Sequence, residues 1–474
     1  MNQGTIDVHC HFFNVSFAFE ELLEIGWRWL RGNYPYKSDE LVRVKGIVTL
    51  PREVQGIVEY VASFFAAAVR DPADNYAYEQ QCYRESHWNS AEPLITAPLM
   101  MDIFFILDNG SARQHKARLE ALSLVQRKAV LRPLDVADKD MPSFDEFAEE
   151  MKAQVVRAVS NKNAGKAIAS MAMPASTLAI ADELERVILG FKEGMLPVAA
   201  ARALPSGGKV QMTRGYRKHL EALRLLRKKN PETVFPFLAV DPRRIGIKKL
   251  VRDQIITGGF RGVKLYSPLG YLPSHPALNP VFKLCVEHRI PVTTHTSPGG
   301  LPSMCDRIVT SSRNKEGVVL PIVFDKKKFL AEHTIKKGES VHSLFFADPD
   351  GWLDVLQSNG LGTLRVNFAH FGGQENILAY ANGDASASNW TGKIIRLMER
   401  FEQVYADISF CPDCDMLLAI DKIFAKHPVV NDRLMFGTDF VMIAMHQCGL
   451  QNYFNHYAGI SEKMARINPQ AFLA

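Results

Sequence analysis

The chain has 474 residues, of which 47% are hydrophobic and 23% are charged, and its formal net charge is +5 at pH 7. This composition is typical of a globular protein and excludes a disordered or fibrous chain. The positive charge is scattered in short basic clusters without interleaved aromatic residues, so we expect no nucleic-acid partner.

Seven cysteines and the absence of a recognisable secretory signal lead us to expect reduced thiols and a cytoplasmic location. The most apolar segment, residues 56–69, is too short to cross a bilayer and contains Glu59. We interpret it as a buried or cap helix, with docking at a membrane surface or on a partner as the alternative. We expect no membrane partner, and a homo-oligomer is left open.

Eight short apolar runs bounded by turn residues are predicted strands. In chain order they are residues 6–11, 94–107, 234–241, 260–266, 290–296, 364–370, 404–410 and 433–439. Helical patterns such as 275–289 and 390–403 separate several of them. This alternation is typical of β/α units with a parallel sheet, and eight units predict a TIM-like (β/α)8 barrel, with residues 1–474 as a single domain.

The spacing of these strands leaves three large insertions, at approximately 30–90, 110–230 and 305–345. We expect them to be mainly helical. Long segments inside a compact domain are usually functional lids. We therefore expect them to cap the rim of the barrel, closing a pocket that excludes bulk water and accepts a small substrate rather than a polymer.

Polar side chains recur where the predicted strands end. In the first strand, alternation places His9 and His11 on one face. The same count places the following residues at the carboxyl ends of later strands: Lys264, His295, His370 and Asp439. Because the carboxyl ends of barrel strands form one rim, we expect these residues to meet there. Imidazoles and a carboxylate are suitable ligands for zinc, iron or manganese.

Two further pairs of residues are weaker candidates for the site. Arg261 and Tyr266 flank Lys264 and are predicted to contact substrate, although an arginine that opens a strand is more often a surface residue. Cys411 and Cys414 have metal-site spacing, but the chain has no second Cys-x-x-Cys pair, so we interpret them as ordinary thiols.

The segments that carry these residues resemble those of the amidohydrolase superfamily. The resemblance is to its amidohydrolase-related branch, the metal-dependent hydrolases and decarboxylases similar to aminocarboxymuconate semialdehyde decarboxylase. The similar segments, in the order of the family, are residues 7–13, 260–273, 290–300, 365–373 and 433–440. The resemblance covers the barrel strands and the closing segment 468–474, but not the insertions.

This resemblance implies one divalent transition metal, with zinc preferred over manganese or iron. His9, His11, His295 and Asp439 would hold it. Asp439 would also take a proton from the metal-bound water, and His370 would stabilise the developing charge.

Lys264 would then be a cation near an anionic substrate. Some superfamily members carry a carbamylated lysine at this strand, so two metals bridged by a carbamylated Lys264 form the alternative.

The family resemblance implies a metal-dependent hydrolase that acts on a small amide, ester or lactone through a metal-activated water. A non-oxidative decarboxylase of an aromatic or unsaturated carboxylic acid is the alternative, because relatives perform that reaction with the same ligands. A catalytically silent barrel that binds a partner is a third hypothesis. The complete ligand set argues against it.

Overall fold

The computed structural model describes residues 4–14, 17, 43–44, 47–48, 71–88, 92–106, 108–110, 153, 210 and 212–474. The apolar segment 56–69 and most of the insertion 110–230 lie outside the described residues. The insertion 305–345 and all the predicted strands except residue 107 lie within them.

All eight predicted strands are present. They are β1 (Ile6–Cys10), β4 (Ile95–Pro98), β5 (Phe237–Ala239), β6 (Gly262–Leu265), β7 (Val292–His295), β10 (Val366–Ala369), β11 (Val404–Asp407) and β12 (Leu434–Met435). β1 pairs with β4, and the other six form one sheet in the order β12-β11-β10-β7-β6-β5. Every one of these pairs is parallel.

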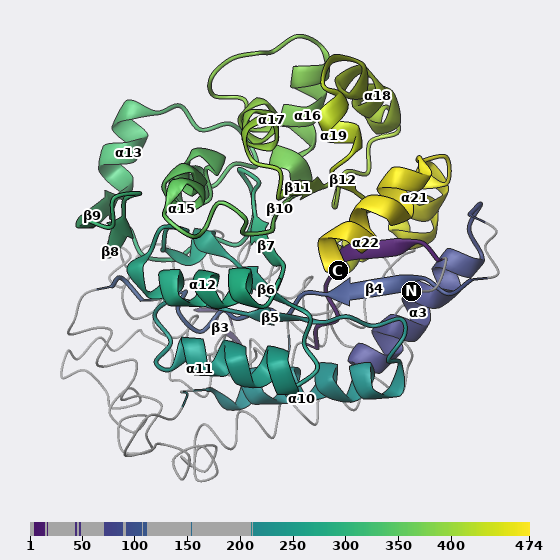
Figure 1. Ribbon diagram of the computed structural model, residues 1–474, viewed down its shortest axis with the longest axis horizontal. Helices are drawn as coiled ribbons and strands as arrows, with labels where there is room; N and C mark the ends of the chain where they lie inside the picture. Colours follow the sequence, from purple (N-terminus) through teal and green to yellow (C-terminus); the bar gives the residue numbers. More distant parts are fainter. Residues whose placement is uncertain are drawn as a thin grey trace.

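Backbone hydrogen bonds join the two sheets at both of their edges. The Thr96 N–H donates to the Thr233 carbonyl at 2.7 Å, which links β4 to the segment that enters β5. The Val8 N–H donates to the Phe436 carbonyl at 3.1 Å, which links β1 to the end of β12. The eight strands therefore form a closed ring, and Figure 1 shows the described helices around it. The predicted (β/α)8 barrel is confirmed.

The helices between the strands also follow the predicted pattern. The two predicted examples are α12 (Asn279–Glu287) and α17 (Trp390–Arg400). The others in the barrel are α3 (Pro72–Arg84), α10 (Arg214–Lys229), α11 (Ile247–Val251), α15 (Leu353–Gln357), α16 (Gln374–Ala381), α18 (Met416–Lys426), α19 (Pro428–Asn431), α20 (Phe440–Met445), α21 (Gly449–Tyr457) and α22 (Asn468–Leu473). None of the helices in the described part of the chain is long and apolar enough to span a membrane.

α17 illustrates why the sequence forms these helices. Its first turn is capped by Asn389, whose side chain accepts the Gly392 N–H at 3.0 Å, an interaction worth about 1 kcal/mol. Ile394, Leu397 and Met398 follow at helical spacing and are buried against the barrel. The strands are buried on both faces, as expected for a parallel sheet covered by helices.

The insertion 305–345 does not begin with the helix that we expected. It forms an antiparallel hairpin of β8 (Arg307–Arg313) and β9 (Val319–Asp325), followed by α13 (Lys326–Glu332) and α14 (Val341–Phe346). Each of the two seven-residue strands contains three β-branched residues, which favour the extended conformation. A second short hairpin, β2 (Arg43–Val44) with β3 (Ile47–Val48), lies in the insertion 30–90.

The hairpin is attached at the carboxyl-end rim of the barrel. The Val309 N–H donates to the Asn109 carbonyl at 2.7 Å, and the Met304 N–H donates to the Ile106 carbonyl at 2.9 Å. Ile106 and Asn109 belong to the loop that follows β4. The insertion therefore lies on the side of the barrel where the polar strand ends are found.

Candidate metal centre

Five predicted side chains meet at the carboxyl ends of the strands. His9 and His11 come from the end of β1, His295 from the end of β7, and His370 and Asp439 from the residues that follow β10 and β12. All five are buried, with exposed fractions between 0% and 8%. The barrel topology therefore brings together residues that are up to 430 positions apart in the sequence.

His9 and His11 direct unprotonated nitrogens toward each other. The Nδ1 atom of His9 lies 3.3 Å from the Asp407 carboxylate, and Nδ1 of His11 lies 2.8 Å from the Leu99 carbonyl. Because each Nδ1 faces an acceptor, it carries the proton, and each Nε2 carries a lone pair. The two Nε2 atoms are 3.3 Å apart, and the Asp439 carboxylate lies 3.7 Å from that of His11.

His295 and His370 form a second pair of the same kind. Nε2 of His295 donates to the Gly299 carbonyl at 3.0 Å, and Nδ1 of His370 donates to the Ser409 carbonyl at 3.1 Å. The remaining nitrogens, Nδ1 of His295 and Nε2 of His370, face each other at 3.2 Å. Both of these nitrogens carry lone pairs.

The protonation states agree with this assignment. Burial lowers the pKa of His11 and of His370 well below the ordinary value, and it lowers the pKa of His295 to about 3. The imidazoles of His11, His295 and His370 are therefore neutral near pH 7. Facing lone pairs at about 3 Å repel each other unless a cation lies between them, and neutral imidazole with carboxylate is the donor set of zinc, manganese and iron sites. The residues present fit a divalent metal.

These donors fall into overlapping groups, and His9 and His370 also share one with Asp407. Donor atoms of His9, His11 and Asp439 all lie within 4.8 Å of one another. His295 instead directs its free nitrogen at His370. His370 thus offers a lone pair to a metal together with His295, rather than only lying beside the site.

Asp407 is a further site residue that we did not predict. It ends β11, accepts the side-chain N–H of Asn367 at 2.6 Å and the backbone N–H of His370 at 3.1 Å, and fixes the tautomer of His9. Burial alone would raise the pKa of Asp407, but its interactions with His9 and the hydrogen bond from the Ser409 hydroxyl lower it far below the ordinary value. The sequence pattern could have identified Asp407 as a site residue, because it lies near the carboxyl end of a predicted strand, as the predicted ligands do.

Backbone strain concentrates around the same residues. Five residues other than glycine have positive φ in the described part of the chain, and His370 (66°), Phe371 (47°) and Asp439 (55°) are three of them. Each such conformation costs about 1 to 3 kcal/mol and persists only when surrounding contacts impose it. For Asp439 such a contact is its N–H, which donates to the His9 carbonyl at 2.6 Å.

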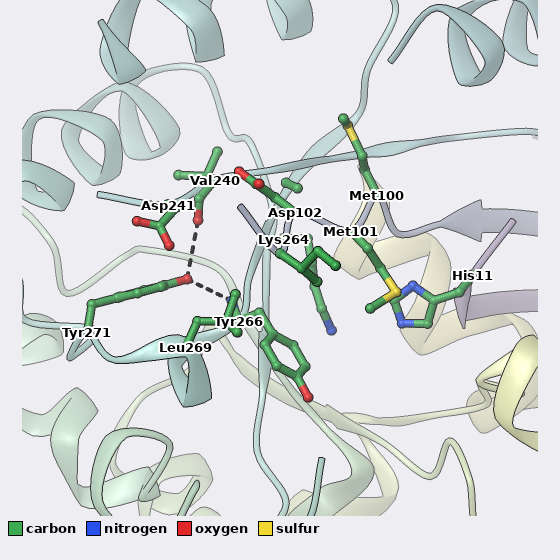
Figure 2. Close-up of a pocket in the computed structure, with 12 residues that line it drawn as sticks. His11, Met100, Met101, Asp102, Val240, Asp241, Lys264, Tyr266, Leu269 and Tyr271 are labelled. Atoms are coloured by element: carbon green, nitrogen blue, oxygen red, sulfur yellow. Dashed lines mark hydrogen bonds between the residues drawn. The ribbon is translucent and has the colours of Figure 1, made fainter. Parts of the chain in front are cut away.

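Lys264 lies beside the histidines, as predicted, but its ammonium is enclosed. The side chain is buried, and Nζ has no hydrogen-bond partner among the described residues. Burial lowers the pKa of Lys264 to about 8. Figure 2 shows Lys264 in a small cavity with His11, Met101 and Tyr266. This cavity, of about 20 Å³, holds no more than one water molecule.

Tyr266 also lies at the site. Its ring centroid is 4.7 Å from that of His295, and its hydroxyl accepts the Leu301 N–H at 2.7 Å. Gly300 must remain small, because a Cβ there would lie 2.5 Å from the Tyr266 hydroxyl and 2.9 Å from Nε2 of His295. The turn after β7 therefore orients both rings.

Arg261 is not brought into the site. It precedes β6, and its N–H donates to the Pro236 carbonyl at 2.7 Å. Its pKa is lowered by burial and by the charges of Arg365 and Arg227, so it lies among cations at the amino-terminal end of the barrel. The rise of β6 along the strand places Arg261 roughly 10 Å from Lys264. The structure therefore places Arg261 at the end of β6 that lies away from the donor residues.

The Cys-x-x-Cys pair provides free thiols. Cys411 is buried and its Sγ donates to the Ser409 carbonyl at 3.6 Å, whereas Cys414 is exposed. Neither Cys411 nor Cys414 forms a disulfide bond. Neither member of the pair lies in the donor groups that contain the histidines.

Two consecutive arginines hold the loop after β4 against the barrel. Arg243 binds Asp241 at 2.6 Å and donates to the Phe105 carbonyl, and Arg244 binds Asp102 at 2.6 Å. Both ion pairs are almost fully buried. They position Met101 and Ile103, which form one wall above the histidines.

A cavity of about 540 Å³ opens above the donor groups. Its floor contains the four histidines, Lys264 and Asp439. Its apolar wall consists of Phe13, Met101, Ile103, Leu301, Phe410, Val441 and Met442. The segment 336–339 of the insertion 305–345 lines it as well, with the charged side chains of Lys336 and Lys337. This size is typical of sites for small molecules.

A closed (β/α)8 barrel with imidazoles and an aspartate gathered at its carboxyl-end rim defines the class of metal-dependent barrel enzymes. The sequence model of the family described as Amidohydrolase matches residues 170–448, more than half of the chain. The chain belongs to the amidohydrolase family. The match includes His295, His370 and Asp439, whereas His9 and His11 precede it. The resemblance inferred from the motifs is confirmed.

Several solved structures share limited similarity with the chain. An uncharacterised TIM-barrel protein from Bordetella bronchiseptica has 18% identity and a TM-score of 0.32, over 54% of this chain and 71% of its own. 2,6-Dihydroxybenzoate decarboxylase from Rhizobium has 16% identity and a TM-score of 0.33, over 54% and 76%.

5-Carboxyvanillate decarboxylase from Novosphingobium aromaticivorans, complexed with manganese, has 12% identity and a TM-score of 0.35, over 54% and 69%. At this level of similarity, these structures say nothing about the reaction of this chain. No curated protein matches it.

Proposed function

We propose that the protein is a metal-dependent hydrolase that acts on a small amide, ester or lactone. The observation that carries this proposal is the convergence of unprotonated imidazole nitrogens and the Asp439 carboxylate at the floor of the 540 Å³ cavity. His9, His11 and Asp439 would hold one divalent ion, with His295 as the fourth ligand, and zinc is preferred over manganese or iron.

A bound metal of this kind supplies a water with a pKa of about 7 and polarises the substrate carbonyl. Asp439 would accept the proton of that water. Burial raises the pKa of Asp439, which makes its carboxylate a stronger base than an exposed one. His370, held by the Ser409 carbonyl, would orient the substrate and stabilise the developing negative charge.

The His295–His370 pair supports the two-ion alternative. Its facing nitrogens, 3.2 Å apart, would help to hold a second ion, and the neutral amine of Lys264 would add to carbon dioxide and release one proton to give a carbamate, a further anionic ligand. In the one-ion arrangement Lys264 instead stays an ammonium that attracts an anionic substrate. The two arrangements differ in metal stoichiometry and in the mass of Lys264.

Removal of the metal is expected to abolish activity. The purified protein should contain about one zinc, manganese or iron ion per chain by elemental analysis, and dialysis against a chelator should remove both metal and turnover on a panel of lactone and carboxylate substrates. Added metal should restore both. Release of carbon dioxide from a carboxylate in that panel would select the decarboxylase alternative.

His9→Ala should lower the metal content, and an unchanged content would contradict the ligand assignment. No metal after expression in supplemented medium would contradict the whole proposal. Two ions per chain together with a carbamate on Lys264 would select the two-ion arrangement.

The insertion 305–345 would serve as a lid that favours anionic substrates. Lys336→Glu with Lys337→Glu should raise KM for an anionic substrate about three- to tenfold and leave kcat almost unchanged, because both side chains line the cavity but belong to neither group of donor residues. Steady-state kinetics at low and high salt would measure this effect.

Lys327→Glu with Lys328→Glu is the matched control, because these exposed lysines of α13 do not line that cavity. An equal rise of KM in the control pair would contradict a local role of Lys336 and Lys337.

A further inference from the structure

A fifth histidine lines the cavity above the donor groups and has no role in the proposed metal centre. His446 follows α20, the helix that begins directly after Asp439, and it is one of the residues around the 540 Å³ cavity. It belongs to none of the possible metal-ligand groups among the described residues. The cavity therefore carries a polar ring that the metal does not require.

The hydrogen bonding of His446 fixes which ring nitrogen carries the proton. Nδ1 accepts the Cys448 N–H at 3.2 Å, so Nδ1 holds a lone pair and the proton of the ring is on Nε2. Nε2 has no hydrogen-bond partner among the described residues. Because Nδ1 is turned toward the backbone of its own chain, the Nε2–H is directed away from that backbone. His446 thus offers a hydrogen-bond donor to the cavity that it lines.

The helix α20 sets the distance between this donor and the metal end of the cavity. Asp439, Met442 and His446 are spaced by three and four positions, so they lie on one face of the helix. All three line the cavity. A rise of about 1.5 Å per residue places His446, seven positions later, roughly 10 Å beyond Asp439. This face therefore has a carboxylate of the donor group at one end, an apolar thioether in the middle and an N–H donor at the other end.

Phe410 packs against the ring of His446. The two ring centroids are 6.3 Å apart and the ring planes are perpendicular. Phe410 also lines the cavity, and its φ of 52° is a conformation that bulky residues rarely adopt and that surrounding contacts must impose. Together with the Cys448 N–H, this contact orients the imidazole before a ligand enters. A donor that is oriented in advance favours binding, because the ligand does not have to order it.

We infer that His446 is a substrate-binding residue whose Nε2–H donates to an oxygen atom at the far end of an elongated substrate. The inference rests on the proposed function, because the metal centre fixes where the reacting carbonyl lies. The apolar stem of the substrate lies along Met442 and Phe410, and its terminal oxygen lies roughly 10 Å from the reacting end. The substrate class is therefore an amide, ester or lactone with an apolar stem that ends in a carboxylate or carbonyl oxygen.

Three metal-binding hydroxamates separate the contributions of the metal centre, the stem and the terminal oxygen. Acetohydroxamate probes the metal centre alone, octanohydroxamate adds an apolar stem, and suberic acid monohydroxamate adds a carboxylate at the end of a stem of the same length. Affinities for the metal-containing full chain would be measured by titration calorimetry. His446→Ala should weaken binding of suberic acid monohydroxamate about ten- to hundredfold, as expected for loss of a hydrogen bond to a charged group. The affinities for the other two probes should change less than about twofold, because neither places an oxygen at His446.

Two conservative variants separate the Nε2–H donor from a structural role of the ring. His446→Gln keeps an N–H near the position of Nε2, so its affinity for suberic acid monohydroxamate should stay within about threefold of wild type. His446→Asn keeps an acceptor near the position of Nδ1 for the Cys448 N–H but lacks the distal donor, and it should lose as much affinity as His446→Ala. His456→Asn is the matched control, because His456 is exposed on α21 and does not line the cavity.

The outcomes distinguish this inference from the proposed function. If acetohydroxamate binds, but wild type and His446→Asn bind suberic acid monohydroxamate equally well, the inference is overturned and the metal centre stands. If acetohydroxamate does not bind to wild type, the metal centre is contradicted and the inference falls with it. An equal loss of affinity for all three probes in the His446 variants would assign a structural role to the ring and would also overturn the inference.

Discussion

Asp439→Asn is expected to lower both metal retention and turnover, and to do so more than any other single substitution at the site. The Asp439 carboxylate lies 3.7 Å from Nε2 of His11 and shares a donor group with His9. The amide keeps the shape but loses the negative charge and the basicity that the two proposed roles require. Metal content by elemental analysis and kcat on a substrate from the panel would measure the two losses separately.

A matched control for Asp439→Asn is Asp241→Asn. Asp241 is also buried near the carboxyl end of a strand, but its partner is Arg243 and it belongs to neither donor group of the histidines. It should lower stability and leave metal content close to one ion per chain. If Asp439→Asn retains full metal and full activity, Asp439 is neither ligand nor base.

His370→Asn should lower kcat about 10²- to 10⁴-fold, the usual contribution of a positioned acid or base. In the one-ion arrangement much of the metal should remain, because His9, His11 and Asp439 form their own donor group. The asparagine retains a side-chain donor of similar reach but has no titratable group. Metal content and kcat of the same preparation would be compared with wild type.

The result for His370→Asn also separates the two metal arrangements. Loss of one of two ions would show that the His295–His370 pair binds a second metal. Full activity of the variant would contradict a catalytic role of His370 in either arrangement. His427→Asn is the control, since His427 is bonded to Tyr380 and Glu399 on the outer helices, away from the donor groups.

The local sequence determined the strands and the residues at their ends. Alternation in residues 6–11 places His9 and His11 on one face because successive side chains of a strand point to opposite sides. The same count placed His295, His370 and Asp439 at strand ends, and the structure gathers all five. Such predictions succeed because the two-residue period of a strand is a short-range property.

The tertiary structure decided how these side chains are oriented. His9 owes its tautomer to Asp407, which lies 398 residues away in the sequence, and His295 and His370 owe theirs to the carbonyls of Gly299 and Ser409. No local pattern contains this information, since it depends on which strands become neighbours. The grouping of the donors around His9 therefore emerged only from the closed barrel.

Two expectations from the sequence, the placement of Arg261 at the site and a mainly helical insertion 305–345, differ from the structure for physical reasons. Arg261 precedes Lys264 by three residues, but a strand carries its two ends to opposite sides of the barrel. The insertion 305–345 begins with a hairpin, and its first strand, β8, is bonded to the loop after β4, a contact between segments about 200 residues apart. Periodicity and residue type in the sequence determine the barrel and its candidate ligands, whereas only long-range packing decides which of those residues share a site.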